Sequence, residues 1–271
     1  MSIHRTLVLA RRPTAGWFRL PAKQCANISI ARAVKKFGAF PGFAITLLGL
    51  SLALTAFVGC EKAQSPAASR SQPAVDLGAT QAKAEQGDAV AQNILGDLLA
   101  HGKGLPQDYT QAAKWYRQSA DQGFAVAQCN LAALYAAGAG VKTDPAEALR
   151  WYRKAADQGN ADAQYNLAQM LSMGVGANRD IREAIRLYHL AAEQGDGLSQ
   201  YNLARRYQAG KDVSPDPVEA YFWFALATAN GVEDALPMRD GLKKEMTRQQ
   251  IAEAKRKVAG FKSRKPTGVT K

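Results

Sequence analysis

The side chains that most often carry out catalysis or bind metal ions are scarce in this chain of 271 residues. Its three histidines, His4, His101 and His189, lie far apart in the sequence. Zinc sites and Ser-His-Asp triads need histidines next to other ligands or a nucleophile, and scattered histidines supply no such cluster. The sequence therefore predicts a protein that is not an enzyme and holds no metal ion or cofactor.

One of the three cysteines lies in a context with its own chemistry. Cys60 follows Phe57-Val58-Gly59, which resembles a lipobox, the signal before a cysteine that becomes diacylated. An apolar run, 43–58, precedes it, and the first 59 residues carry eight basic and no acidic side chains, as in a secretory leader. The pattern predicts lipid (palmitate-type) attachment at Cys60, and a plain signal peptide or a retained anchor are the alternatives. Because this leader is unusually long, we hypothesise that translation begins at Val34.

The rest of the chain is dominated by an internal repeat of 36 residues. Glycines recur in strict register at Gly87, Gly123, Gly159, Gly195 and Gly231. Other columns keep the same spacing, namely Gln92, Gln128, Gln164 and Gln200; Leu95, Leu131, Leu167 and Leu203; Gly102, Gly138, Gly174 and Gly210; and Asp108, Asp144, Asp180 and Asp216. So many columns in register indicate tandem copies of one structural unit.

Each repeat has the pattern of two antiparallel helices. A first helix ends at the Gly102 column, because glycine adopts the left-handed cap conformation at no steric cost. A second helix begins after the Asp108 column, where aspartate is a favourable N-cap, and a Gln or Glu three residues later suggests a capping box. The aromatic column of the second helix, with Trp115, Trp151 and Trp223, predicts core packing between hairpins.

Units such as AQYNLAQMLSMGVGANRDIREAIRLYHLAAEQG (163–195) resemble the Sel1-like repeat, a relative of the tetratricopeptide repeat. The resemblance covers about residues 84–231. It implies an all-α superhelical solenoid of four hairpins that binds other proteins. Two departures are Leu187 in the Trp column and Asp212 in place of the second glycine of a G-x-G turn, so we expect the fourth turn to differ in shape.

The domain organisation predicted for the chain has four parts. They are a leader and lipoprotein signal peptide (1–59), a flexible tether (60–80), four repeats (81–231) and a C-terminal pair of capping helices with a basic tail (232–271). Thr247 and Gln250 predict a capping box at the start of the last helix. Removing the eight basic residues of 1–59 lowers the formal charge from +12 to +4, so the composition does not point to nucleic acid.

The resemblance also suggests where a ligand could bind. In related tetratricopeptide proteins an asparagine in a Y-N-L context binds peptide backbone, since its amide is both donor and acceptor. The corresponding predicted groove residues are Asn130, Asn166, Asn202, Tyr165, Tyr201, Arg205 and Arg206. The arginines could pair with a carboxylate and the tyrosines add amphipathic contact area. The alternative for the asparagines is hydrogen bonding between helices.

We therefore expect a scaffold that is lipid-anchored in the bacterial cell envelope, faces the periplasm and binds a peptide or protein partner in the concave groove. A peptidoglycan or exopolysaccharide ligand is the alternative, so a glycan contact stays open. Glu61 after the lipidated cysteine is not the aspartate usually associated with inner-membrane retention. This favours the outer membrane over the inner.

Overall fold

The chain is described here by a computed structural model that covers residues 76–263, and the leader, Cys60 and most of the tether lie outside the described residues. The described part is all-helical, as predicted. Its helices are α1 (Leu77–Glu85), α2 (Ala89–His101), α3 (Tyr109–Asp121), α4 (Ala125–Ala137), α5 (Pro145–Asp157), α6 (Ala161–Met173), α7 (Ile181–Glu193), α8 (Gly197–Ala209), α9 (Pro217–Ala229), α10 (Ala235–Glu245) and α11 (Arg248–Gly260).

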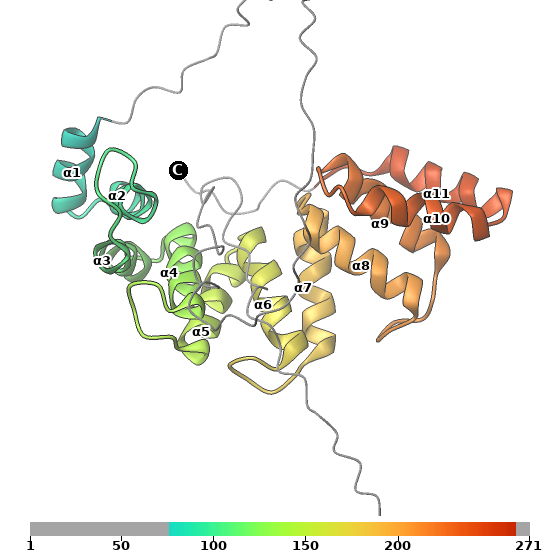
Figure 1. Cartoon of the computed structure of the whole chain (residues 1–271), viewed down its shortest axis with the longest axis horizontal. Coiled ribbons are helices and arrows are strands. Elements are labelled where there is room, and N and C mark those ends of the chain that lie inside the picture. The colour runs from blue at the N-terminus through green and yellow to red at the C-terminus, as the bar shows by residue number, and fades with distance from the viewer. Residues whose placement is uncertain (1–75, 264–271) are drawn as a thin grey trace, which may run out of the picture. The chain divides into compact units, whose positions relative to one another are not determined.

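Four helical hairpins, α2–α3, α4–α5, α6–α7 and α8–α9, stack in chain order (Figure 1). Each second helix packs against the first helix of its own hairpin and against the first helix of the next. This is the arrangement expected of a solenoid, in which each unit contacts mainly its neighbours. The predicted fold of four hairpins is confirmed.

Local capping sets the ends of these helices. All four glycines of the Gly102 column are left-handed, with φ between 62° and 71°. All four aspartates of the Asp108 column accept a hydrogen bond from the backbone N–H three residues later, at 2.9–3.0 Å. The predicted caps are therefore present, but the glutamate of the capping box is used elsewhere: Glu147 accepts from the Trp151 indole.

The fourth turn keeps the backbone conformation of the other three, contrary to the expectation from Asp212. Its φ of 67° lies close to the 68° of Gly140 and the 77° of Gly176. Aspartate tolerates this region better than most residues. Here the Asp212 side chain is also held by Arg206 at 2.7 Å and by Arg179 at 3.5 Å.

A ladder of buried glutamines joins successive hairpins. Each side-chain amide of the Gln92 column donates to a carbonyl near the end of the preceding second-type helix, at 2.9–3.2 Å: Ala84, Ala120, Ala156 and Ala192. Each glutamine also accepts, at 2.7–2.9 Å, from the C-cap side chain of its own hairpin: Gln122, Gln158, Gln194 and Asn230. The column therefore ties three helices together at every step, with both amide atoms satisfied.

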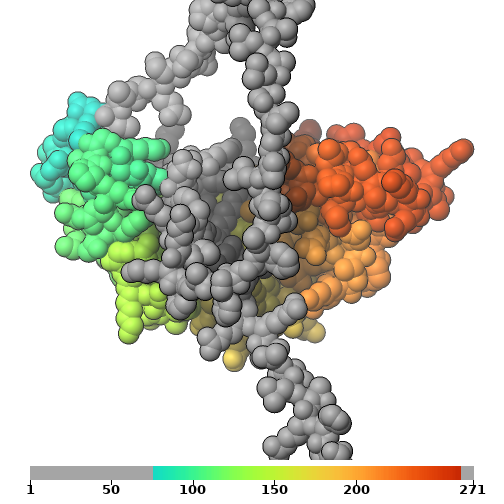
Figure 2. All heavy atoms as spheres, in the orientation of Figure 1, coloured from blue at the N-terminus to red at the C-terminus, as the bar shows by residue number. Residues whose placement is uncertain are grey.

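The array is closed at both ends by extra helices, and the C-terminal pair was predicted. At the start, α1 begins at Leu77, within the segment predicted as tether (60–80), and takes the place of a second helix; its Ala84 carbonyl accepts the first hydrogen bond of the glutamine ladder. At the end, α10 and α11 both pack on α9, and their side chains close the gaps between the ribbons (Figures 1 and 2). The predicted Thr247–Gln250 capping box is formed, with both reciprocal hydrogen bonds present.

The core between the layers contains two aromatic columns, of which the tryptophan column was predicted. Tyr116, Tyr152, Tyr188 and Phe224 are at most 2% exposed. Trp151 and Trp223 are buried beside them, which confirms their packing role, whereas Trp115 in the first hairpin is half-buried against a smaller N-terminal cluster.

Candidate functional site

The predicted ligand-binding residues lie on the first helices of the hairpins. We call the side chains of three columns on α2, α4, α6 and α8 the first-helix face: residues 93, 129, 165 and 201; 94, 130, 166 and 202; and 97, 133, 169 and 205. In the first two hairpins, α2 and α4 meet along these columns, because the Asn130 amide on α4 donates to Asn93 at 3.1 Å and to Asp97 at 3.2 Å on α2. The repeat therefore brings together side chains from successive copies.

Asp97 is the acidic centre of this face and was not predicted. Its carboxylate accepts from the Tyr116 hydroxyl at 2.6 Å, and Asn93 donates to its other oxygen at 3.3 Å. Tyr116 can approach because the neighbouring residue is Gly96, where a Cβ would lie 2.6 Å from the tyrosine ring. Burial raises the pKa of Asp97 to about 6, although these hydrogen bonds and nearby His101 and Lys103 lower it.

The three asparagines have three different environments. Asn130 is 2% exposed and makes the inter-helix bonds described above, which favours the alternative interpretation for this residue. Asn202 is half-buried and donates to the Leu198 carbonyl of its own helix at 2.9 Å. Asn166 is fully buried, and neither its amide nitrogen nor its oxygen has a hydrogen-bond partner among the described residues. Ligand binding by the asparagines stays a prediction.

The two tyrosines differ in accessibility. Tyr165 is 4% exposed; its hydroxyl accepts from Gln169 at 2.6 Å and its ring packs edge-on against Tyr188. Tyr201 is half-buried and packs edge-on against Phe224. Only Tyr201 offers a substantial contact area to a ligand.

The two arginines differ in the groups with which they interact. Arg206 is paired with Asp212 at 2.7 Å and lies over the Tyr188 ring, so its guanidinium already holds a carboxylate of this chain. Arg205 is exposed, lies 6.0 Å from the centre of the Tyr201 ring, and forms no ion pair among the described residues. Arg205 is therefore the arginine that remains available for a ligand carboxylate.

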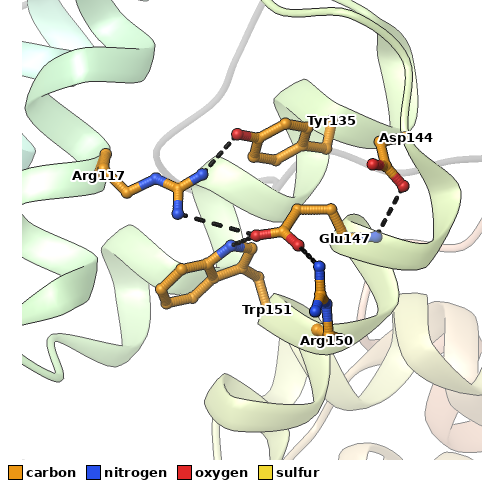
Figure 3. A network of polar contacts seen from close by, with 6 residues as sticks. All are labelled: Arg117, Tyr135, Asp144, Glu147, Arg150 and Trp151. Carbon is orange, nitrogen blue, oxygen red and sulfur yellow. Dashed lines mark hydrogen bonds and ion pairs between the residues drawn. The ribbon is translucent and has the colours of Figure 1, made fainter.

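A polar network on the second helices fixes how neighbouring hairpins are joined (Figure 3). The Arg117 guanidinium of α3 donates to the Tyr135 hydroxyl of α4 and lies 3.7 Å from the Glu147 carboxylate of α5. It also lies over the Trp151 ring, whose indole donates to Glu147 at 2.7 Å. Arg150 forms a further ion pair with Glu147. One cation thus joins three helices and links α3 of the first hairpin to α4 and α5 of the second.

The joint between the third and fourth hairpins keeps the tyrosine, glutamate and tryptophan of this network but has histidine in place of the arginine. His189, Tyr207, Glu219 and Trp223 stand 72 residues after Arg117, Tyr135, Glu147 and Trp151. The His189 ring contacts Tyr207 and Trp223, and burial lowers its pKa, although Glu193 and Glu219 raise it. Lys257 of α11 forms the ion pair with Glu219 instead, and the buried Trp223 indole nitrogen has no hydrogen-bond partner among the described residues.

The remaining predictions concern the two cysteines Cys129 and Cys60 and the absence of a metal site. Cys129 is fully buried, as expected for a small residue in the repeat core. Within residues 76–263 no helix is long and apolar enough to span a bilayer, and no group of three or more potential metal ligands occurs. Cys60, the predicted lipid site, lies outside the described residues.

Comparison with known proteins identifies the repeat. The family model "Sel1 repeat" matches residues 89–124, 125–160, 161–196 and 197–232. Among solved structures, the chain is similar to a Sel1 repeat protein from Oxalobacter formigenes, with 30% identity over 65% of this chain and 75% of that one, and a TM-score of 0.55.

A second structure is c5321 of uropathogenic Escherichia coli, a protective antigen with an SLR fold. It is 30% identical over 67% of this chain and 47% of that one, with a TM-score of 0.47. No curated protein sequence matches the chain.

Proposed function

Because the chain belongs to the Sel1 repeat family, whose members are generally non-catalytic scaffolds for protein–protein interaction, we propose that its first-helix face binds a segment of a partner protein. The four family matches tile residues 89–232 without a gap, so one array of four repeats carries the face, and its more accessible side chains, Asp97, Tyr201 and Arg205, belong to the first and last hairpins.

The observation that carries this proposal is how the residues differ between copies. Columns shared by all four repeats are used for caps, for the glutamine ladder and for the core. One column that varies in every copy lies on the first-helix face and reads Asp97, Ala133, Gln169 and Arg205. A repeat scaffold achieves specificity through such positions, since the shared ones only maintain the fold.

A crosslinking pull-down with the full-length chain tests the proposal. We expect one or a few specific proteins, and we expect Tyr201→Ala with Arg205→Ala to reduce their recovery several-fold. Arg182→Ala is the matched control, because Arg182 is an exposed arginine on a second helix, α7. Equal recovery with all variants, or only nonspecific proteins, would contradict binding at the first-helix face.

The same proposal places the scaffold in the cell envelope, held by lipid at Cys60 and facing the periplasm, with the outer membrane favoured. Its support is the apolar run 43–58 followed by the FVGC sequence. We expect Cys60→Ser to move the protein from the membrane fraction to the soluble fraction and to abolish labelling with palmitate. A protein that labels equally well without Cys60 would contradict the lipid anchor.

A further inference from the structure

The first-helix face carries opposite charges at its two ends. In the column that runs across α2, α4, α6 and α8, the residues are Asp97, Ala133, Gln169 and Arg205. The two central members are neutral, and the charged ones belong to the first and last hairpins. Adjacent columns add no opposing charge, because they hold Asn93, Cys129, Tyr165 and Tyr201, and Ile94, Asn130, Asn166 and Asn202.

The end formed by the first hairpin is rich in acceptors. Asp97 is partly exposed, and its second oxygen receives only the 3.3 Å contact from Asn93. One turn later, the His101 ring places Nδ1 at 2.7 Å from the Asp97 backbone carbonyl. This contact requires the proton on Nδ1, and Nε2 is buried without a partner among the described residues. The accessible acceptor at this end is therefore the Asp97 carboxylate, which interacts with nearby Lys103 and can pair with an ammonium group.

The centre of the face contains an unsatisfied amide. Asn166 is fully buried, yet its nitrogen and oxygen both lack a hydrogen-bond partner within residues 76–263. A buried amide without partners is costly, on the order of 1–3 kcal/mol for each group. An amide both donates and accepts, so the N–H and C=O groups of a peptide backbone could satisfy it once the side chains that cover it move aside.

At the end formed by the fourth hairpin, the charged residue of the first-helix face is Arg205. Arg205 is exposed and lies beside Tyr201, whereas Arg206 is already paired with Asp212. An arginine beside an aromatic ring is suited to a carboxylate on a peptide side chain or C-terminus, because its planar donors pair with both oxygens.

From this charge distribution we infer that the first-helix face binds an extended peptide whose two ends carry opposite charges, with a basic group at Asp97 and an acidic group at Arg205. The inference rests on the proposed function and specifies its ligand. Three steps between first helices of about 8–10 Å each span roughly 24–30 Å, which about eight or nine extended residues cover at about 3.3 Å per residue.

The test uses synthetic nine-residue peptides with blocked termini and a fluorescent label, measured by fluorescence anisotropy. The first has two lysines at one end and two glutamates at the other. The second has the same composition with the four charges at the centre, and the third has two lysines at each end. We expect the end-charged peptide to bind the wild-type chain roughly three- to tenfold more tightly than the centre-charged one.

Charge reversal identifies the contact at the basic end of the face. Arg205→Glu should lose the preference for the end-charged peptide and bind the peptide with lysines at both ends more tightly, while Arg182→Glu on α7 should behave like the wild type. Asp97→Asn, which retains a hydrogen-bond acceptor for Tyr116, should weaken the end-charged peptide several-fold. Circular dichroism of each variant checks that the helices are intact.

The outcomes separate this inference from the proposed function. If no peptide binds, or if both charge arrangements bind equally and Arg205→Glu changes nothing, the inference is overturned. The pull-down decides the proposed function independently, because a specific partner whose recovery does not depend on peptide charge leaves the scaffold in place without this ligand.

Discussion

At the scale of single residues, Asp97 is the side chain whose environment most changes its chemistry. Burial raises its pKa from 3.8 to about 6, so the folded state holds the proton more tightly than the unfolded chain. The contribution to stability is therefore fully present below pH 3.8 and is lost as the pH rises through about 6. Between low pH and pH values well above 6, the contribution of Asp97 to the free energy of unfolding falls by on the order of 3 kcal/mol.

We therefore expect Asp97→Asn to be more stable than the wild type at pH 7 by up to a few kcal/mol, with the difference disappearing near pH 4. The asparagine keeps an acceptor for the Tyr116 hydroxyl, so the surroundings are preserved. Urea unfolding at several pH values measures this, with Asp121→Asn, an exposed carboxylate on α3, as control. A gap that grows as the pH falls would contradict the assignment.

At the scale of helices, α11 supplies the cation that pairs with the glutamate at the joint between the third and fourth hairpins. In the first joint Glu147 pairs with Arg117 and also accepts from the Trp151 indole. In the last joint the position of Arg117 is occupied by His189, and Lys257 from α11 pairs with Glu219. Phe261, directly after α11, packs on Trp223 as well. In the last joint, Lys257 of α11 thus provides the cation that Arg117 provides in the first joint.

Lys257→Met should release Glu219 to accept a hydrogen bond from the Trp223 indole, as Glu147 does from Trp151. We expect the Trp223 indole proton resonance to shift in NMR spectra, while stability changes by less than about 1 kcal/mol because the pair is partly exposed to solvent. Lys255→Met, at an exposed position of the same helix, serves as control. An unshifted Trp223 resonance in the Lys257 variant would show that Glu219 does not re-pair.

At the scale of the whole molecule, the glutamine ladder is the repeated link through which the hairpins are coupled. Stability of a repeat array depends on each unit and on the interface with its neighbour. Gln164 connects the second hairpin to the third, because it donates to Ala156 and accepts from Gln194. Gln92 makes the same contacts at the N-terminal end, where only α1 precedes it.

Replacing Gln164 with leucine should cost about 1–3 kcal/mol, because buried groups on both sides lose their partner. It should also lower the urea m-value or split the transition, since the two halves of the array would unfold less cooperatively. Gln92→Leu should lose similar local stability but leave the main transition single. Identical unfolding curves for the two variants would contradict the coupling role.

The amino-acid sequence by itself determined the repeat, the helix ends and the all-helical class. These follow from local contacts, because a glycine or aspartate at a helix end interacts with backbone groups within a few residues. The residue types and their spacing therefore indicate where a helix begins and ends. Position 212 shows the limit, because its left-handed turn was retained with aspartate in place of glycine.

Only the tertiary structure decided what the recurring polar side chains contact. Asn130 donates a hydrogen bond to Asn93 on another hairpin. Glu147 accepts from the Trp151 indole and pairs with Arg117 instead of completing a capping box, and Arg206 forms an ion pair with Asp212. Such partners depend on how closely two helices pack and which rotamers fit between them. The spacing of 36 residues placed Asp97 and Arg205 in one column, while packing determined that Arg206 is paired with Asp212 and that Arg205 is not.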